Sequence, residues 1–231
     1  MKPFHFKQFT LEQNKNVFRV GTDGVLLGVL ASVKDAGKIL EVGTGSGLIS
    51  LMVAQRNPKA KITALDIDPD AFALAKTNFS NSPFTKNLFA LQQDFKDFSS
   101  CEKYDAIISN PPYFDENRSE KDILARQQIT LSFENLIKKS AILLQENGVL
   151  SVIIPFEMGL IFEEFGLKYG LKVHRKIKIF GIENAPPKRW ILELGFGEKE
   201  REEKSLTIEK SPRQFTEEYL NLTQDFHLFK K

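Results

Sequence analysis

Short apolar runs alternate with longer amphipathic stretches from Lys38 onward, and this alternation restricts the possible folds more than any other feature. The strand-like runs lie at 38–42, 61–65, 88–92, 104–109 and 149–154, and the helix-like stretches at 46–57, 69–79, 132–145 and 157–169. Buried strands separated by helices form right-handed βαβ crossovers, which place the strands parallel and cover both faces of the sheet. The pattern therefore predicts an α/β fold with a mostly parallel sheet.

The last third of the sequence changes character. Residues 172–180 and 188–196 alternate polar and apolar side chains around a loop with two prolines, which predicts an antiparallel hairpin at one end of the sheet. With this hairpin the sheet has seven strands. The charged run 198–204 is interpreted as an exposed turn, and 211–229 as an amphipathic helical tail. No linker divides the chain, so we expect one domain over residues 1–231, with an amino-terminal arm at 1–37 and a core at 38–231.

Composition excludes several classes of protein. A single cysteine, Cys101, excludes a disulfide framework and a zinc knuckle, and three scattered histidines have no ligand spacing, so we expect no metal. The longest apolar stretch contains Pro155 and is too short to span a membrane, and the amino terminus lacks the apolar region of a secretion signal. We therefore expect a cytoplasmic protein with no membrane contact. Nothing in the sequence demands a dimer, so a monomer is expected.

The amino-terminal arm mixes aromatic and basic side chains. Phe4, Phe6, Phe9 and Phe18 stand among four basic residues, opposed by Glu12 alone. Rings interleaved with basic groups are suited to single-stranded nucleic acid. The alternative, which we favour from these residues, is that the rings pack back onto the core.

A glycine-rich loop, Glu41-Val-Gly-Thr-Gly-Ser-Gly47, joins the first core strand to its helix. Glycines there let the backbone approach a ligand, and the helix amino terminus offers unpaired N–H groups. Leu48 replaces the third glycine of the dinucleotide fingerprint, and no Gly-Lys-Ser/Thr follows as in a P-loop. The spacing instead resembles that of S-adenosylmethionine-dependent methyltransferases. It predicts that Glu41, Gly43, Gly45 and Gly47 bind this cofactor, which leaves as S-adenosylhomocysteine.

Acidic residues stand at the ends of the next two strands. Asp66 ends the second strand, where a carboxylate can accept both ribose hydroxyls of a cofactor. Asp68 is the competitor, and we expect it to cap the following helix. Asp94 and Phe95 follow the third strand, where they can contact the amino group and the ring of an adenine. Each acid alone would more often be a cap or turn residue, but their order along the strands favours cofactor binding.

The tetrapeptide Asn110-Pro111-Pro112-Tyr113 follows the fourth strand, at the edge where α/β sheets bind ligands. A purine amine is a weak nucleophile because its lone pair is delocalised into the ring. The Asn110 side-chain oxygen and the Pro111 carbonyl are two acceptors for such an amine, Pro112 stiffens the backbone, and Tyr113 offers a stacking face. The alternative is a plain turn. The motif also serves enzymes that methylate guanine amines or glutamine amides.

Four segments together carry a family resemblance: 18–28, the glycine loop, 108–114 and the tail 214–229. They are similar to the bacterial tRNA1(Val) adenosine N6-methyltransferases. The resemblance implies a Rossmann-like class I methyltransferase fold, methylation of adenosine 37 in the anticodon loop, and closure of the segment at Gly21 and Thr22 over the cofactor. Thr22 and Asp23 also suit a helix cap. Methylation of guanine N2 in ribosomal RNA, methylation of a release-factor glutamine and a non-catalytic binding module remain alternatives.

Basic side chains are concentrated between Gly166 and Trp190. A phosphate-binding face needs charge gathered in this way, so the stretch is a candidate surface for an anticodon stem-loop. A solvated hairpin is the alternative. Glu183 is the only acid in this stretch, and its basic residues are Lys168, Lys172, Arg175, Lys176, Lys178, Lys188 and Arg189.

Overall fold

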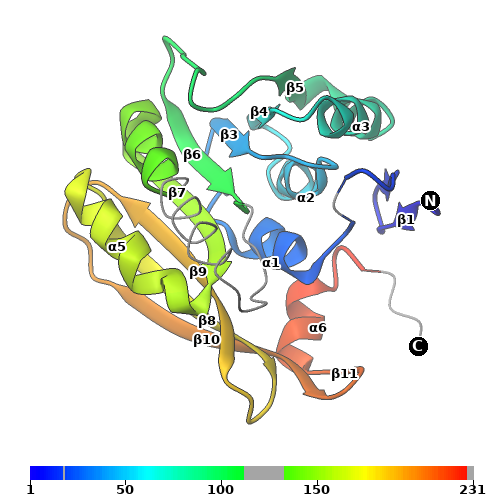
Figure 1. Ribbon diagram of the computed structural model, residues 1–231. Helices are drawn as coiled ribbons and strands as arrows, with labels where there is room; N and C mark the ends of the chain where they lie inside the picture. The colour runs from blue at the N-terminus through cyan, green and yellow to red at the C-terminus, as the bar shows by residue number, and fades with distance from the viewer. Residues whose placement is uncertain (18, 112–132, 228–231) are drawn as a thin grey trace, which may run out of the picture.

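A central sheet of nine strands organises the computed structural model, which describes residues 1–17, 19–111 and 133–227 (Figure 1). The sheet order is β11-β10-β8-β9-β7-β6-β3-β4-β5. The five strands predicted first are β3 (Lys38–Val42), β4 (Lys61–Asp66), β5 (Leu88–Gln92), β6 (Tyr104–Ser109) and β7 (Leu144–Pro155). All five are parallel to one another, as their apolar runs and helical connections predict.

Helices cover both faces of the sheet (Figure 1). One apolar core lies under α1 (Thr22–Leu30), α2 (Leu48–Arg56) and α3 (Pro69–Ser80). A second core, on the opposite face, lies under the helical segment 133–143 and α5 (Gly159–Lys168). Within the described residues, no helix combines the length and the apolar character that crossing a membrane requires.

The predicted terminal hairpin is present as β8 (Lys172–Ile182) and β9 (Pro187–Gly195), and β9 runs antiparallel to both β7 and β8. Two further strands extend the sheet beyond the predicted seven. β10 (Glu202–Ser211) adds parallel to β8, and β11 (Gln214–Phe215) adds antiparallel to β10. The expected exposed turn at 198–204 is therefore wrong for its last three residues. These three residues are charged, although they begin a strand. The apolar side chains of this strand that pack against the core are Leu206 and Ile208.

The tail is helical over a shorter range than predicted. Helix α6 spans Glu217–Thr223, and the Thr216 hydroxyl caps it by accepting a hydrogen bond from the Tyr219 N–H at 3.1 Å. Tyr219 and Phe226 are both buried against the core. The tail thus closes over the sheet with only two turns of helix.

The amino-terminal arm forms a small hairpin, β1 (Phe4–His5) with β2 (Thr10–Leu11). The rings of Phe6 and Phe9 are buried and stack at 4.6 Å, and Phe6 also stacks on His227 at 5.5 Å. The Lys7 N–H donates to the Phe226 carbonyl at 2.8 Å. The packing interpretation is therefore confirmed for Phe6 and Phe9, whereas Phe18 lies outside the described residues.

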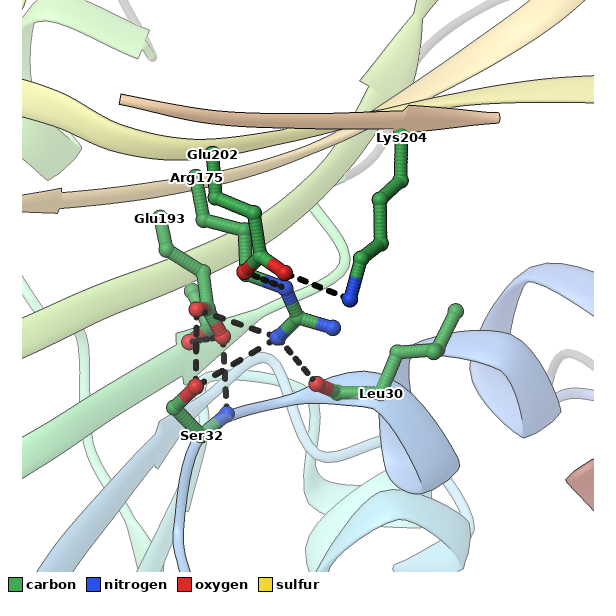
Figure 2. A network of polar contacts seen from close by, with 7 residues as sticks. Leu30, Ser32, Arg175, Glu193, Glu202 and Lys204 are labelled. Atoms are coloured by element: carbon green, nitrogen blue, oxygen red, sulfur yellow. Dashed lines mark hydrogen bonds and ion pairs between the residues drawn. The ribbon is translucent and has the colours of Figure 1, made fainter. Parts of the chain in front are cut away.

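A buried polar network ties the end of α1 to the terminal strands (Figure 2). Glu193 of β9 is 3% exposed, and its carboxylate accepts from the Ser32 N–H at 2.7 Å, the Ser32 hydroxyl at 2.8 Å and the Ser151 hydroxyl at 3.0 Å. The Arg175 guanidinium donates to Glu193 at 3.2 Å and to the Leu30 carbonyl at 2.8 Å. The carboxylate and its donors thus satisfy one another, as burial requires.

Candidate active site

A cavity of about 490 Å³ opens at the carboxyl edge of the sheet, where β3 and β6 end. Its walls come from the start of α1, the glycine loop, the end of β6 and the start of β9. No group of three or more His, Cys, Asp or Glu in the described part of the chain is arranged to hold a metal ion. Six of the residues predicted as site residues line this cavity together: Gly21, Thr22, Gly43, Gly45, Asn110 and Pro111.

The glycine loop is held in a shape that side chains disfavour. Gly43, Gly45 and Gly47 have φ values of 75°, 57° and 83°. The N–H groups of Gly43 and Thr44 donate to the Leu65 carbonyl at 2.9 Å each, which anchors the loop to the neighbouring strand. Gly47 does not line the cavity. Its backbone lies against the Phe79 ring, which an added Cβ would approach to 2.5 Å.

Replacing Gly47 with alanine is expected to destabilise the protein more than the same change at Gly43. A positive φ costs an alanine about 1–2 kcal/mol at either position. Gly47 adds a collision with Phe79, whereas no atom of the described residues lies within 4 Å of a Cβ built at Gly43. Overpacking of this kind costs about 1–3 kcal/mol more. Denaturant titration compares the two variants, and equal losses of unfolding free energy would contradict the packing argument.

Glu41 lies behind the loop rather than on the cavity wall. Its Oε2 accepts from the Thr44 hydroxyl at 2.8 Å, from the Ser50 N–H at 3.1 Å and from the Ser50 hydroxyl. Its Oε1 is buried and has no hydrogen-bond partner within the described residues. Burial raises the pKa of Glu41 to about 7, and the hydrogen bonds from Ser50 and Thr44 oppose part of this rise. The geometry indicates a residue that braces the loop.

Burial gives Glu41 a pH signature. The folded protein retains a proton that the unfolded chain releases, because the pKa rises from 4.5 to about 7 on folding. The resulting stability is present below the unfolded pKa and is lost as pH rises through the folded one. Glu41→Gln keeps an oxygen acceptor without the charge. We subtract the unfolding free energy of wild type from that of Glu41→Gln at each pH. This difference is expected to be about 2 kcal/mol larger at pH 8 than at pH 5. Chemical denaturation at both pH values measures this, and a pH-independent difference would refute it.

The predicted ribose acid contacts the loop. One oxygen of Asp66 accepts from the Gly45 N–H at 2.8 Å, and the other accepts from the Asp68 N–H at 3.0 Å. Asp68 caps α3 as predicted, because its carboxylate accepts from the N–H groups of Asp70 and Ala71. Asp66 is therefore adjacent to the cavity without lining it.

Asp94 and Phe95 follow β5, next to the end of β4. The Gln93 N–H donates to the Asp66 carbonyl at 2.9 Å, which joins the two strand ends. The Asp94 carboxylate accepts from the Lys96 N–H at 2.8 Å within its own turn. Phe95 is partly buried and packs against the second core. The structure places this pair on the carboxyl edge but outside the cavity lining.

Asn110 presents an unsatisfied acceptor to the cavity. Its side-chain oxygen is buried and has no hydrogen-bond partner in the part of the chain that the structure describes. Leaving such an atom unpaired costs about 1–3 kcal/mol, so its retention at a cavity indicates a ligand that donates to it. Pro111 lies beside it on the same wall. The predictions for Pro112 and Tyr113 fall outside the described residues.

Three charged residues on the cavity wall were not predicted as site residues. Arg189 on β9 pairs at 3.0 Å with Asp23 at the start of α1, and Arg19 lines the same cavity. Asp23 had a local explanation as a helix cap, and Arg189 was counted only as part of a basic stretch. Arg19 adjoins the Gly21–Thr22 segment, and this proximity was the one available signal.

Most of the basic stretch is neutralised by acids from elsewhere in the chain. A count within residues 166–190 cannot detect these partners, because they lie on other elements of the fold. The stretch therefore carries much less free charge than its composition suggests. The ion pairs join Lys168 to Glu134, Lys172 to Glu198, Arg175 to Glu193 and Glu202, Lys176 to Glu163, and Arg189 to Asp23.

Comparison with known proteins of similar sequence assigns the chain to a family. The family model described as "Methyltransferase small domain" matches residues 15–178. A tRNA1(Val) (adenine(37)-N6)-methyltransferase of a Flavobacteriaceae bacterium (strain 3519-10) is 52% identical, over 99% of this chain and 100% of the relative. The chain belongs to this methyltransferase family. Another protein of that name, from Bacteroides thetaiotaomicron, is 38% identical over 99% of this chain and 98% of its own length.

Solved structures confirm the fold expected for the tRNA1(Val) (adenine(37)-N6)-methyltransferase family. A predicted O-methyltransferase from Agrobacterium tumefaciens superposes with a TM-score of 0.70 at 20% identity, covering 88% of this chain and 96% of that one. TrmN from Thermus thermophilus gives 0.58 at 18% identity, covering 75% of this chain and 48% of that one. At these identities the likeness concerns architecture alone, and it confirms the predicted class I methyltransferase fold.

Proposed function

We propose that this chain methylates N6 of adenosine 37 in the anticodon loop of tRNA1(Val), with S-adenosylmethionine as the methyl donor. Full-length similarity to relatives with that name supports the substrate. The observation that carries the chemistry is the buried oxygen of Asn110, which shares a cavity with the glycine loop and has no hydrogen-bond partner among the described residues.

The residues at the cavity fit the cofactor. A volume of about 490 Å³ matches the size of small-ligand sites, and Gly43 and Gly45 expose backbone there without side chains. When bound, S-adenosylmethionine supplies an electrophilic methyl group on its sulfonium. Gly21 and Thr22 contact its methionine end, and Asp66 accepts from its ribose hydroxyls.

The remaining predicted residues divide into a pair that contacts the adenine and a pair that shapes the loop. Asp94 and Phe95 hold the adenine, since they follow the strand next to Asp66. Gly47 and Glu41 act through the shape of the loop, the first by packing on Phe79 and the second through its hydrogen bonds. In this proposal residues 1–231 work as one domain, and the segment at Gly21 and Thr22, within the arm 1–37, closes over the cofactor.

The tetrapeptide holds the amine that is methylated. The Asn110 side-chain oxygen and the Pro111 carbonyl accept hydrogen bonds from the two N6–H groups, which orients the nitrogen and favours a pyramidal, nucleophilic geometry. Pro112 stiffens this backbone and Tyr113 stacks on the target base. Positioning supplies most of the rate, and the proton leaves after transfer, so no residue has to act as a general base.

A transfer assay tests the proposal. Purified protein is mixed with labelled S-adenosylmethionine and tRNA that lacks the modification, and the RNA is digested to nucleosides for mass spectrometry. We expect labelled N6-methyladenosine from the anticodon loop. Calorimetry of cofactor binding is a separate readout. Labelled N2-methylguanosine from ribosomal RNA, or a labelled glutamine in a release factor, with tRNA unlabelled, would overturn the substrate assignment.

A further inference from the structure

Two lysines of the basic stretch remain without a carboxylate partner among the described residues. They are Lys178 on β8 and Lys188 on β9. The other five basic side chains between Gly166 and Trp190 form ion pairs with acids of neighbouring elements. The charge available to an anionic partner is therefore confined to one end of the hairpin.

This end of the hairpin lies at the carboxyl edge of the sheet, near the cavity. Lys178 pairs in register with Trp190, which in turn pairs with Ile154 of β7. Lys188 stands at a register shift between β9 and β8, and its side chain lies over Gly181 of β8. Asn110 follows β6, two strands from β9, which corresponds to roughly 10 Å across the sheet. Lys188 adjoins Arg189, which lines the cavity, so this end of the hairpin lies near a base held by Asn110.

The Trp190 ring supports Lys178, and it also lies 4.3 Å from the ammonium of Lys176. The ring stacks on Phe156 at 5.0 Å, and the bare backbone of Gly159 makes room for it, since a Cβ there would lie 2.7 Å from the indole. The Lys178 ammonium lies 5.4 Å from the Trp190 ring centroid. A cation–π contact holds an ammonium without using its N–H donors. Lys178 therefore keeps its hydrogen-bonding capacity for a ligand.

The Lys188 side chain packs against the backbone of Gly181. Its stem and ammonium lie 3.3–3.5 Å from the point where a Cβ of Gly181 would stand. The absence of a side chain at Gly181 leaves this path across β8 open. Both lysines are thus supported by contacts that do not neutralise them.

We propose that Lys178 and Lys188, with Lys178 positioned by Trp190, bind backbone phosphates of the RNA next to the methylated adenosine. The proposal rests on the proposed function and adds to it the residues that hold the substrate backbone. Phosphate contacts orient a nucleic acid without reading its sequence. Their role is to place the anticodon loop so that its adenosine reaches Asn110.

The test compares two double variants that remove the same charge. Lys178→Gln/Lys188→Gln removes the unpaired lysines, and Lys168→Gln/Lys172→Gln removes two paired ones. Binding of an unmodified anticodon stem-loop RNA is measured by fluorescence anisotropy over a range of salt concentrations, alongside methyl transfer to the same RNA. Each lost phosphate contact on a single strand lowers the slope of log affinity against log salt by about 0.7.

We expect Lys178→Gln/Lys188→Gln to bind the RNA about tenfold more weakly at physiological salt, with the slope reduced by about 1.4. Its S-adenosylmethionine affinity and thermal midpoint should equal those of wild type. The Lys168→Gln/Lys172→Gln protein should bind the RNA as wild type does. Equal losses in both variants, or no loss in the first while wild type methylates the RNA, overturn the phosphate sites and leave the proposed function standing. Failure of wild type to methylate the RNA overturns both.

Discussion

An Asn110→Ala protein will bind the cofactor normally and transfer methyl groups at least a hundredfold more slowly. Removing one positioned hydrogen-bond partner of a reacting group costs about 10²–10³ in kcat. The same change should not reduce stability, because the Asn110 oxygen has no partner to lose within the described residues. Loss of a buried, unpaired acceptor leaves the unfolding free energy unchanged or slightly higher. Asn110→Ala is therefore expected to lose activity without losing stability.

Ser109→Ala is the matched control. Ser109 precedes Asn110 at the end of β6, and its hydroxyl donates to the Val42 carbonyl at 2.9 Å. Its removal should cost about 1 kcal/mol of stability and little activity. Single-turnover transfer, cofactor calorimetry and denaturant titration separate the two patterns. An Asn110→Ala enzyme with the wild-type rate would refute the mechanism, whatever the substrate.

Glu193→Ala should be the most destabilising single substitution in the terminal strands. The change leaves the Arg175 guanidinium, the Ser32 N–H and the Ser151 hydroxyl without their shared acceptor (Figure 2). Removing one partner of a buried ion pair costs about 3–5 kcal/mol. We expect a loss at the lower end of this range, because Arg175 keeps its ion pair with Glu202 at 3.3 Å. The free energy of unfolding from denaturant titration measures this loss.

Two further variants test the cause of that loss. Glu193→Gln keeps the shape and one acceptor and should lose less than Glu193→Ala. Glu193→Leu combined with Arg175→Met removes both charges and should recover much of the stability, since apolar replacement of a buried pair is often tolerated. A double variant as unstable as the single one would show that the charge imbalance is not the cause.

The core of the fold could be predicted because its strands are buried on both faces. Such strands appear in sequence as continuous apolar runs, and β3 to β6 begin and end within one residue of the predicted bounds. β10 gave no such signal, since it lies near the sheet edge and its first residues are charged. Its placement depends on pairing with β8, and a local pattern carries no information about that partner.

The cavity was predictable in part for a related reason. Motifs at the ends of parallel strands converge on one edge, which brought Gly43, Gly45 and Asn110 together with Gly21. A sequence pattern does not show which residues of distant elements come into contact, so the Asp23–Arg189 ion pair was not predicted. The placement of Glu41 behind the loop also required the three-dimensional structure. Asp94 and Phe95 remain predictions.

The contact between the amino-terminal hairpin and the tail affects how the protein is made. A ribosome synthesises the hairpin first, yet Phe6 pairs with His227, and the Lys7 N–H needs the Phe226 carbonyl. These contacts cannot form until almost all the described chain has left the exit tunnel. The amino-terminal hairpin therefore completes its packing only after residues 226 and 227 have been synthesised. Premature termination would leave the Phe6 ring without its contact to His227 and accessible to chaperones.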